Sequence, residues 1–194
     1  MSTERVVFMQ GSFLRWAALF AGLSVTASQT AEAQRFPSIE GLEIRAGVLW
    51  PENASAGFGF ASDVDLGHLQ MAALRPFIGA YSFSADVDEA TGDQGSFRGV
   101  GGRAGLRIAS FTGRFQPHLL AAISGTAVDA SLDDPRSSEL LNGFYIGVDL
   151  GVGAAIPVTR GDRLFGVAEF RRTISSNVSR YALDVGLRYL VRTR

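Results

Sequence analysis

One pattern recurs eight times along this chain: about ten residues in which apolar side chains alternate with polar or small ones, followed by a turn or loop. The segments span 42–50, 57–66, 74–86, 98–109, 115–128, 144–156, 163–173 and 181–191. Alternation with period two is typical of β-strands, because successive side chains point to opposite faces. Pro76 and Pro117 fall near predicted strand starts, where a missing N–H donor is least harmful. The pattern therefore predicts an all-β fold of eight strands.

The N-terminal segment has the features of a secretory signal peptide. Arg5 and Arg15 precede a short apolar run, Trp16–Ala27, and Ala31-Glu32-Ala33 follows as a small-residue cleavage site. A transmembrane anchor is the alternative, but the run is shorter than the roughly 20 residues that a spanning helix needs. We therefore predict a signal peptide over 1–33, cut after Ala33, and one domain over 34–194.

The charges within the segments favour a closed membrane barrel over a soluble one. They share the face that is also rich in Gly, Ala and Ser, and they are Glu43, Asp63, Asp149, Glu169 and Asp184 against Arg45, Arg103, Arg107, Arg171 and Arg188. Eight strands enclose little more than room for side chains, so opposed charges there can neutralise one another. A soluble barrel would instead turn this face to water, where bulkier polar residues serve equally well. We predict that the charged face lines the lumen and the apolar face contacts lipid.

This parity assigns individual residues. Leu150 and Val185 are predicted to face lipid, while Asp149, Asp184 and Arg188 face the lumen. Aromatic residues of the apolar face should form girdles at two rims: Trp50, Phe58, Tyr81, Phe83, Phe144 and Tyr181 at one, and Phe77, Phe115 and Tyr189 at the other. Connections 51–56, 87–97, 130–141 and 175–180 include the longest and most polar loops, and 67–73, 110–114 and 157–162 are the turns at the opposite end. Longer loops on the outside are the rule for membrane barrels.

Together with the signal-like N-terminus, phrases such as Arg75–Ala80, Gly143–Gly153 and Tyr181–Val191 resemble the small outer-membrane β-barrel family that includes the OmpA-type and OmpX-type barrels and the opacity proteins. The resemblance covers nearly all of the mature chain. It implies a closed, eight-stranded, antiparallel, up-and-down transmembrane β-barrel, located in the bacterial outer membrane. It also implies outer-membrane lipids, lipopolysaccharide and the assembly machinery as partners. Such barrels often end in an aromatic residue, whereas this chain ends Arg192-Thr193-Arg194, which leaves Tyr189 and Val191 as the recognition signal.

The chemistry-bearing residues indicate no catalytic, cofactor or metal site. His68 lies in a predicted turn and His118 on an inner face, and no metalloprotease or nucleophile-elbow motif occurs. Four acidic residues could hold a divalent ion, although a solvated acidic loop explains them better: Asp129, Asp133, Asp134 and Glu139. Arg160-Gly161-Asp162 is predicted as a turn. The net charge of −1 gives no basic footprint for nucleic acid.

The function predicted from these observations is a non-enzymatic, monomeric envelope protein with a structural or surface-interaction role, in adhesion or envelope integrity. A narrow, porin-like pore is one alternative. The other is an enzyme that modifies lipid A or phospholipid, which would need a His and Ser pair facing lipid near the outer rim. His118 has the wrong parity and lies at the other end, so we predict no enzyme.

Overall fold

The structure is a computed structural model that describes residues 39–52, 54–67, 74–87, 94–109, 114–159, 163–176 and 178–191. Several predictions concern residues outside these ranges. They are the signal peptide, His68, the turn at 160–162, the middle of the 87–97 loop and the last three residues.

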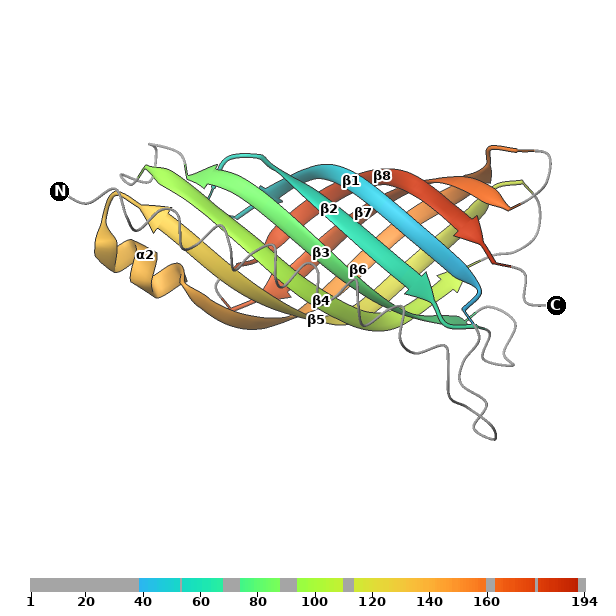
Figure 1. The fold of residues 1–194 in the computed structure, drawn as a ribbon, viewed down its shortest axis with the longest axis horizontal. Coiled ribbons are helices and arrows are strands. Elements are labelled where there is room, and N and C mark those ends of the chain that lie inside the picture. The colour runs from blue at the N-terminus through green and yellow to red at the C-terminus, as the bar shows by residue number, and fades with distance from the viewer. Residues whose placement is uncertain are drawn as a thin grey trace, which may run out of the picture. The chain divides into compact units, whose positions relative to one another are not determined.

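Eight antiparallel strands form one closed barrel, as the alternation predicts. They are β1 (Gly41–Pro51), β2 (Gly57–Asp65), β3 (Leu74–Val87), β4 (Gly95–Ala109), β5 (Gln116–Leu132), β6 (Gly143–Pro157), β7 (Leu164–Ser175) and β8 (Arg180–Leu190). Each strand pairs with its neighbours in sequence, and β1 pairs with β8 to close the ring. Figure 1 shows the strands running at a tilt to the long axis of the barrel. Closure leaves no strand without a partner on either side, which removes the free edges of an open sheet.

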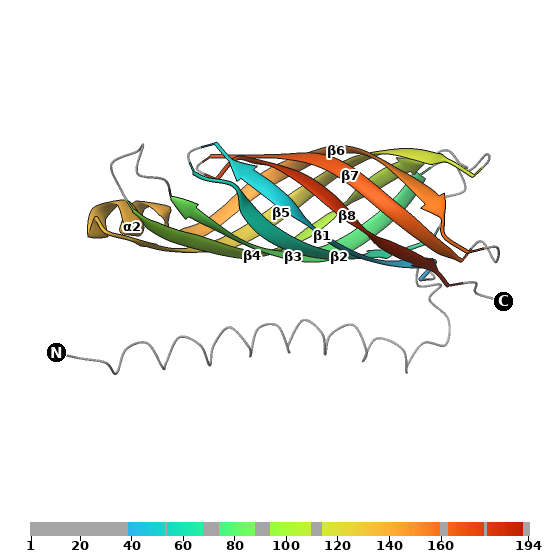
Figure 2. The same ribbon diagram turned by 90° about the horizontal axis from the view of Figure 1, so that it is seen from above.

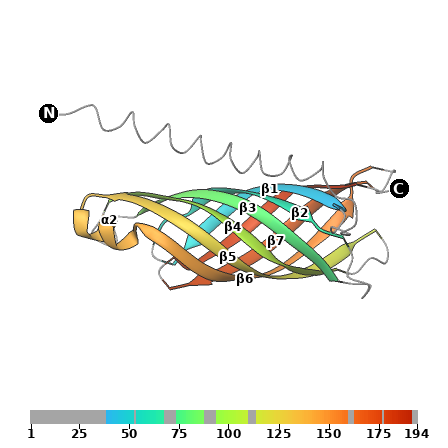
Figure 3. The same ribbon diagram turned by 60° about the horizontal axis from the view of Figure 1, so that its bottom comes forward.

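The two ends of the barrel differ. We call the end where β1 begins opposite Leu190 the terminal end, and the other the loop end. Strands β3 to β6 have 14, 15, 17 and 15 residues, whereas β7, β8, β1 and β2 have 12, 11, 11 and 9. We call β3 to β6 the long wall. Figures 2 and 3 show β4 and β5 reaching beyond β1 and β8 at the loop end.

A short helix, α2 (Pro135–Leu141), joins β5 to β6 at the loop end, within a segment predicted as an irregular loop. Asp134 caps it by accepting a hydrogen bond from the backbone N–H of Arg136, and Pro135 occupies its first turn. An Asp-Pro pair is a helix-start signal, since the side chain satisfies a free donor and proline fixes φ. Seven residues are too few for a 3.6-residue period to appear, so periodicity alone missed the helix.

Burial along the strands alternates residue by residue and confirms most of the predicted parity. Leu150 is 49% exposed and its neighbour Asp149 is 1% exposed. Val185 is likewise exposed, while Asp184 and Arg188 are buried. The exposed apolar side chains form a belt around the barrel that includes Leu42, Ile44, Phe60, Leu106, Leu119, Ile123, Ile146, Val148, Val152 and Leu187. In the described part of the chain, no helix is long and apolar enough to cross a bilayer.

The parity predicted for the third strand is wrong. Phe77, Tyr81 and Phe83 are buried in the lumen rather than turned to lipid. Residues directly opposite one another on paired strands share a face, and Phe77 lies opposite Asp65 while Tyr81 lies opposite Ala61. The predicted girdles therefore lose these three members. Trp50, Phe58 and Phe144 toward the loop end, and Phe115 and Tyr189 toward the terminal end, remain exposed.

Candidate functional site

The lumen holds a connected group of buried charges, which we call the charge network. Its members are Glu43, Asp63, Asp65, Asp149, Glu169 and Asp184 with Arg45, Arg103, Arg107, Arg171 and Arg188. All ten charged residues predicted to face the lumen belong to it. Asp65, which shares the parity of Asp63, is the one further member.

Asp63 on β2 is one centre of the network. Arg103 from β4 binds it in a forked geometry, with Nη2 at 2.7 Å from Oδ2 and Nε at 3.0 Å from Oδ1. Arg45 from β1 donates to the same carboxylate at 2.7 Å, and Arg107 lies 3.3 Å away. Forked guanidinium–carboxylate pairs are the strongest ion pairs in proteins, because two hydrogen bonds fix the geometry. Three strands are therefore linked across the lumen through one side chain.

Glu43 on β1 is the second centre, and it lies at the closing seam. Arg188 from β8 lies directly opposite Glu43 and donates to it at 2.5 Å. Arg45 forms an ion pair with the other oxygen, with Nε at 3.0 Å, and also pairs with Glu169. His118 Nε2 lies 3.3 Å from Glu169 Oε2. Each carboxylate thus has a cation beside it, without which burial of its charge would cost several kcal/mol.

Glycine makes room for these long side chains. Gly79 lies opposite both Asp63 and Arg103, and Gly186 lies opposite Arg45. A Cβ added at Gly79 would overlap the Asp63 carboxylate, and one at Gly186 would overlap the Arg45 side chain. The abundance of glycine on the charged face therefore follows from crowding in a narrow lumen.

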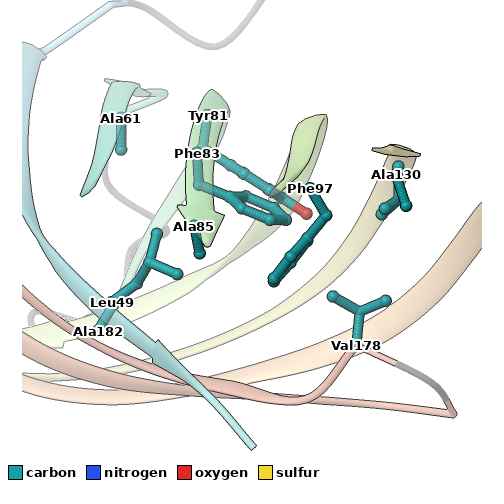
Figure 4. Close-up of a cluster of buried hydrophobic side chains, with 10 residues drawn as sticks. Leu49, Ala61, Tyr81, Phe83, Ala85, Phe97, Ala130, Val178 and Ala182 are labelled. Atoms are coloured by element: carbon teal, nitrogen blue, oxygen red, sulfur yellow. The ribbon is translucent and has the colours of Figure 1, made fainter. Parts of the chain in front are cut away.

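Toward the loop end the lumen becomes apolar (Figure 4). We call these residues the loop-end cluster: Leu49, Ala61, Tyr81, Phe83, Ala85, Phe97, Val128, Ala130, Val178 and Ala182. Phe83 and Phe97 meet edge to face, with ring centroids 5.8 Å apart. The Tyr81 hydroxyl lies 2.5 Å from Thr126 Oγ1, so its polar end is satisfied. The lumen thus holds two chemistries, the charge network and the apolar loop-end cluster. Two smaller apolar clusters lie outside both: Phe77 with Leu120 and Ala122, and Ala155 with Phe165 and Val167.

Sequence reasoning missed two buried cations, Arg75 on β3 and Arg180 on β8. Arg75 shares parity with Phe77, so its charge was a signal that the third strand had been assigned the wrong way round. Arg180 stands one residue before the predicted eighth segment and shares the parity of Asp184 and Arg188, so extending that segment by one residue would have placed it in the lumen.

No metal or catalytic constellation was predicted, and three features bear on that point. Within the described residues, no group of three His, Asp or Glu side chains is arranged to hold a metal ion. Asp134, one of the acidic loop residues, caps α2 and accepts a hydrogen bond from Ser137 at 3.1 Å. His118 is buried on the lumenal face, as predicted, and not beside the apolar belt.

Comparison with known proteins supports the fold alone. No model of a known protein family matches the chain, and no curated protein matches its sequence. Among solved structures, neisserial surface protein A matches with a TM-score of 0.55 and 16% identity, over 78% of this chain and 96% of that one. OprG from Pseudomonas aeruginosa matches with a TM-score of 0.53 and 11% identity, over 80% and 97%.

A third match is the outer membrane enzyme PagL, with a TM-score of 0.50 and 11% identity over 77% of this chain and 99% of that one. The names of the three matches describe a surface protein, an outer membrane protein and an enzyme, so the fold does not choose among roles. The chain spans nearly the whole length of each match. It has the fold of the small eight-stranded β-barrels of bacterial outer membranes.

Proposed function

We propose that this protein is an outer-membrane barrel with a surface-interaction role. The filled barrel anchors the long wall in the membrane, and α2 presents a contact surface. The apolar belt then faces lipid, including lipopolysaccharide, after insertion by the outer-membrane assembly machinery. The terminal end faces the periplasm, because the longer connections lie at the loop end. The signal peptide at 1–33 and a monomeric state belong to the same proposal.

The observation that carries this proposal is the construction of the β5–β6 connection. Asn142 Oδ1 accepts from the Ala130 backbone N–H at 2.5 Å, and Ser138 Oγ accepts from that of Leu132 at 2.8 Å. The Tyr145 hydroxyl donates to the carbonyl oxygens of Leu140 and Leu141, each at 3.1 Å. Side chains thus hold α2 in one place, although barrel closure does not need it.

The surface held in this way is partly apolar. Leu140 on α2 is 75% exposed. An apolar side chain held in water by an ordered scaffold costs free energy that a partner's contact recovers. Leu140 is therefore the residue that we place at the centre of the contact.

The filled lumen argues against the pore alternative. The charge network crosses the barrel from β1 to β4 and β8. The loop-end cluster fills the lumen toward the loop end. An ion on this path would have to break several buried ion pairs. We expect no steady conductance from the purified barrel in planar bilayers, and single-channel steps at neutral pH would contradict this expectation.

The surface role is tested by replacing residues 133–142 with a short Gly-Asn turn in cells that display the barrel. Cell–cell aggregation and adhesion to immobilised extracellular-matrix proteins are measured, with surface amount and heat-modifiable migration as checks on folding. We expect normal folding and insertion with loss of adhesion. Leu140→Asp should reproduce the loss, and Leu150→Ala on the lipid-facing belt is the matched control.

Two outcomes would overturn the proposal. One is failure of the loop replacement to insert, because α2 would then be part of the scaffold. The other is unchanged adhesion in both variants, with only detergent sensitivity altered when the whole protein is removed, which would point to envelope integrity instead.

A further inference from the structure

One charged side chain lies on the apolar belt, away from the ends of the barrel. In the described strands, four charged side chains are exposed, and three of them, Asp86, Arg98 and Asp129, lie near the loop end of the long wall. The fourth, Arg172 on β7, lies directly opposite Leu150, the central residue of β6. Charged side chains that face the hydrocarbon region of a bilayer are rare and costly, so Arg172 indicates a function.

Arg172 has two partners in the described part of the chain. Its Nη2 lies 3.3 Å from Oε1 of Glu52, which follows β1 at the loop end. Its guanidinium carbon lies 5.1 Å from the ring centre of Tyr181, which is directly opposite on β8 and stacks on Phe170. The guanidinium is therefore turned toward the loop end, as expected for a long side chain whose stem crosses apolar surface.

The ion pair between Arg172 and Glu52 leaves donors and acceptors open to a ligand. The two side chains are 46% and 47% exposed, and one hydrogen bond joins them. A guanidinium has five N–H donors and a carboxylate has two oxygens, so most of this capacity is free for other partners. At a lipid-facing position such groups need partners, and a lipid head group can supply them. Because the pair carries no net charge, the complementary head group is one that has both an anion and a cation.

Arg172 also lies at the β7 end of an apolar groove on the outer face. The groove has a volume of about 550 Å³, within the range of about 300–1,000 Å³ that is typical of ligand pockets. Directly opposed residues form a row across it, Leu106, Ala121, Leu150 and Arg172, in which the small side chain of Ala121 lies between two leucines. Among the described residues, every other side chain of the lining is apolar, including Phe170, or is absent at glycine. Such a groove fits an acyl chain.

We propose that Arg172, Glu52 and this groove bind one diacyl lipid with a phosphoethanolamine head group, namely phosphatidylethanolamine. Arg172 donates to the lipid phosphate, Glu52 accepts from the ammonium group, and one acyl chain lies in the groove. Phosphatidylglycerol offers the phosphate without an ammonium group, and the quaternary ammonium of phosphatidylcholine has no N–H to donate to Glu52. The phosphates of lipid A would face Glu52 with charge of the same sign. The site does not depend on the surface role proposed for α2.

The test counts the lipids that the refolded barrel retains in native mass spectrometry. The barrel is taken from micelles of a neutral detergent that contain phosphatidylethanolamine, phosphatidylcholine and phosphatidylglycerol with the same acyl chains, or lipid A, at equal mole fractions. We expect one phosphatidylethanolamine to be retained several-fold more often than each of the others. Arg172→Gln and Glu52→Gln should each abolish this preference. Arg98→Gln, which removes an exposed arginine outside the groove, should keep it.

Ala121→Phe tests the groove separately from the head-group contacts. It fills the floor of the groove from the lipid side and leaves Arg172 and Glu52 in place, so retention should fall while heat-modifiable migration stays normal. Equal retention of the three phospholipids by the wild type would overturn the proposal. So would a preference for phosphatidylglycerol or lipid A, because Arg172 alone would then be attracting an anionic head group.

Discussion

The two parts of the lumen fill the same barrel by different physical means. In the charge network, each side chain is held by a few short, directional contacts, such as the fork from Arg103 to Asp63. In the loop-end cluster, Phe83 and Phe97 are held by many weak, non-directional contacts. The charge network should lose stability when a single atom type is exchanged, whereas the loop-end cluster should tolerate substitutions that preserve volume. Shape-preserving substitutions in the two parts should therefore have very different costs.

Asp63→Asn should give the largest effect, although it alters shape very little. It removes the charge shared by Arg45, Arg103 and Arg107, and breaking a buried pair in this way costs about 3–5 kcal/mol. Urea unfolding of the barrel in lipid vesicles measures this cost. Adding Arg103→Gln should recover part of the loss by restoring neutrality. If the free energy of unfolding of Asp63→Asn alone lies within about 1 kcal/mol of the wild type, the loss is below that expected for a buried pair. The two parts of the lumen would then not differ in this way.

Leu150→Arg tests whether a charge is tolerated one residue away from the network, on the outer face. The side chain is exposed on the apolar belt, so the guanidinium would meet lipid, at a cost of about 2–4 kcal/mol near the bilayer midplane. Neutralising a lumenal acid should give no rescue. The loss should be present in vesicles and much smaller in a short-chain detergent that lets water reach the belt. A harmless Leu150→Arg with a stabilising Asp149→Leu would mean a soluble barrel of opposite parity.

Gly79→Ala probes the space that the network needs. Its Cβ would overlap the Asp63 carboxylate and displace the fork, which is overpacking at a cost of about 1–3 kcal/mol. Gly102→Ala on β4 is the matched control, because the nearest atom to its new Cβ lies 3.6 Å away. Equal unfolding midpoints for the two variants would show that the lumen adapts to an added methyl group.

Leu49→Met should have the smallest effect. It keeps hydrophobic volume within the loop-end cluster, and such exchanges usually cost less than about 1.5 kcal/mol. The same unfolding assay compares it with Asp63→Asn. A cost as large as that of Asp63→Asn would mean that the apolar part is packed as specifically as the charged one.

This contrast also explains which features the sequence could predict. Residues such as Asp149 and Arg188 were assigned correctly, because a charge on a strand with apolar alternate positions can only face the lumen. The parity predicted for the third strand was wrong because Phe77, Tyr81 and Phe83 also line the lumen, so apolar character does not distinguish its two faces. Only the cross-strand register, or the charge of Arg75, distinguishes them. The position of the Arg180 guanidinium over the rings of Tyr81 and Phe83 depends on three-dimensional proximity between β3 and β8, which alternation within a strand does not encode.

The seam between β1 and β8 has a consequence for assembly. Glu43 and Arg188 are 145 positions apart, so their contact cannot form until the last strand has arrived. Contacts of such long sequence separation form late and slowly. Until then Glu43 lacks one of its arginines, so an intermediate that buries this carboxylate has a higher free energy. Completion of the ring is thus coupled to neutralisation of its interior, which favours a barrel that is either open and hydrated or fully shut.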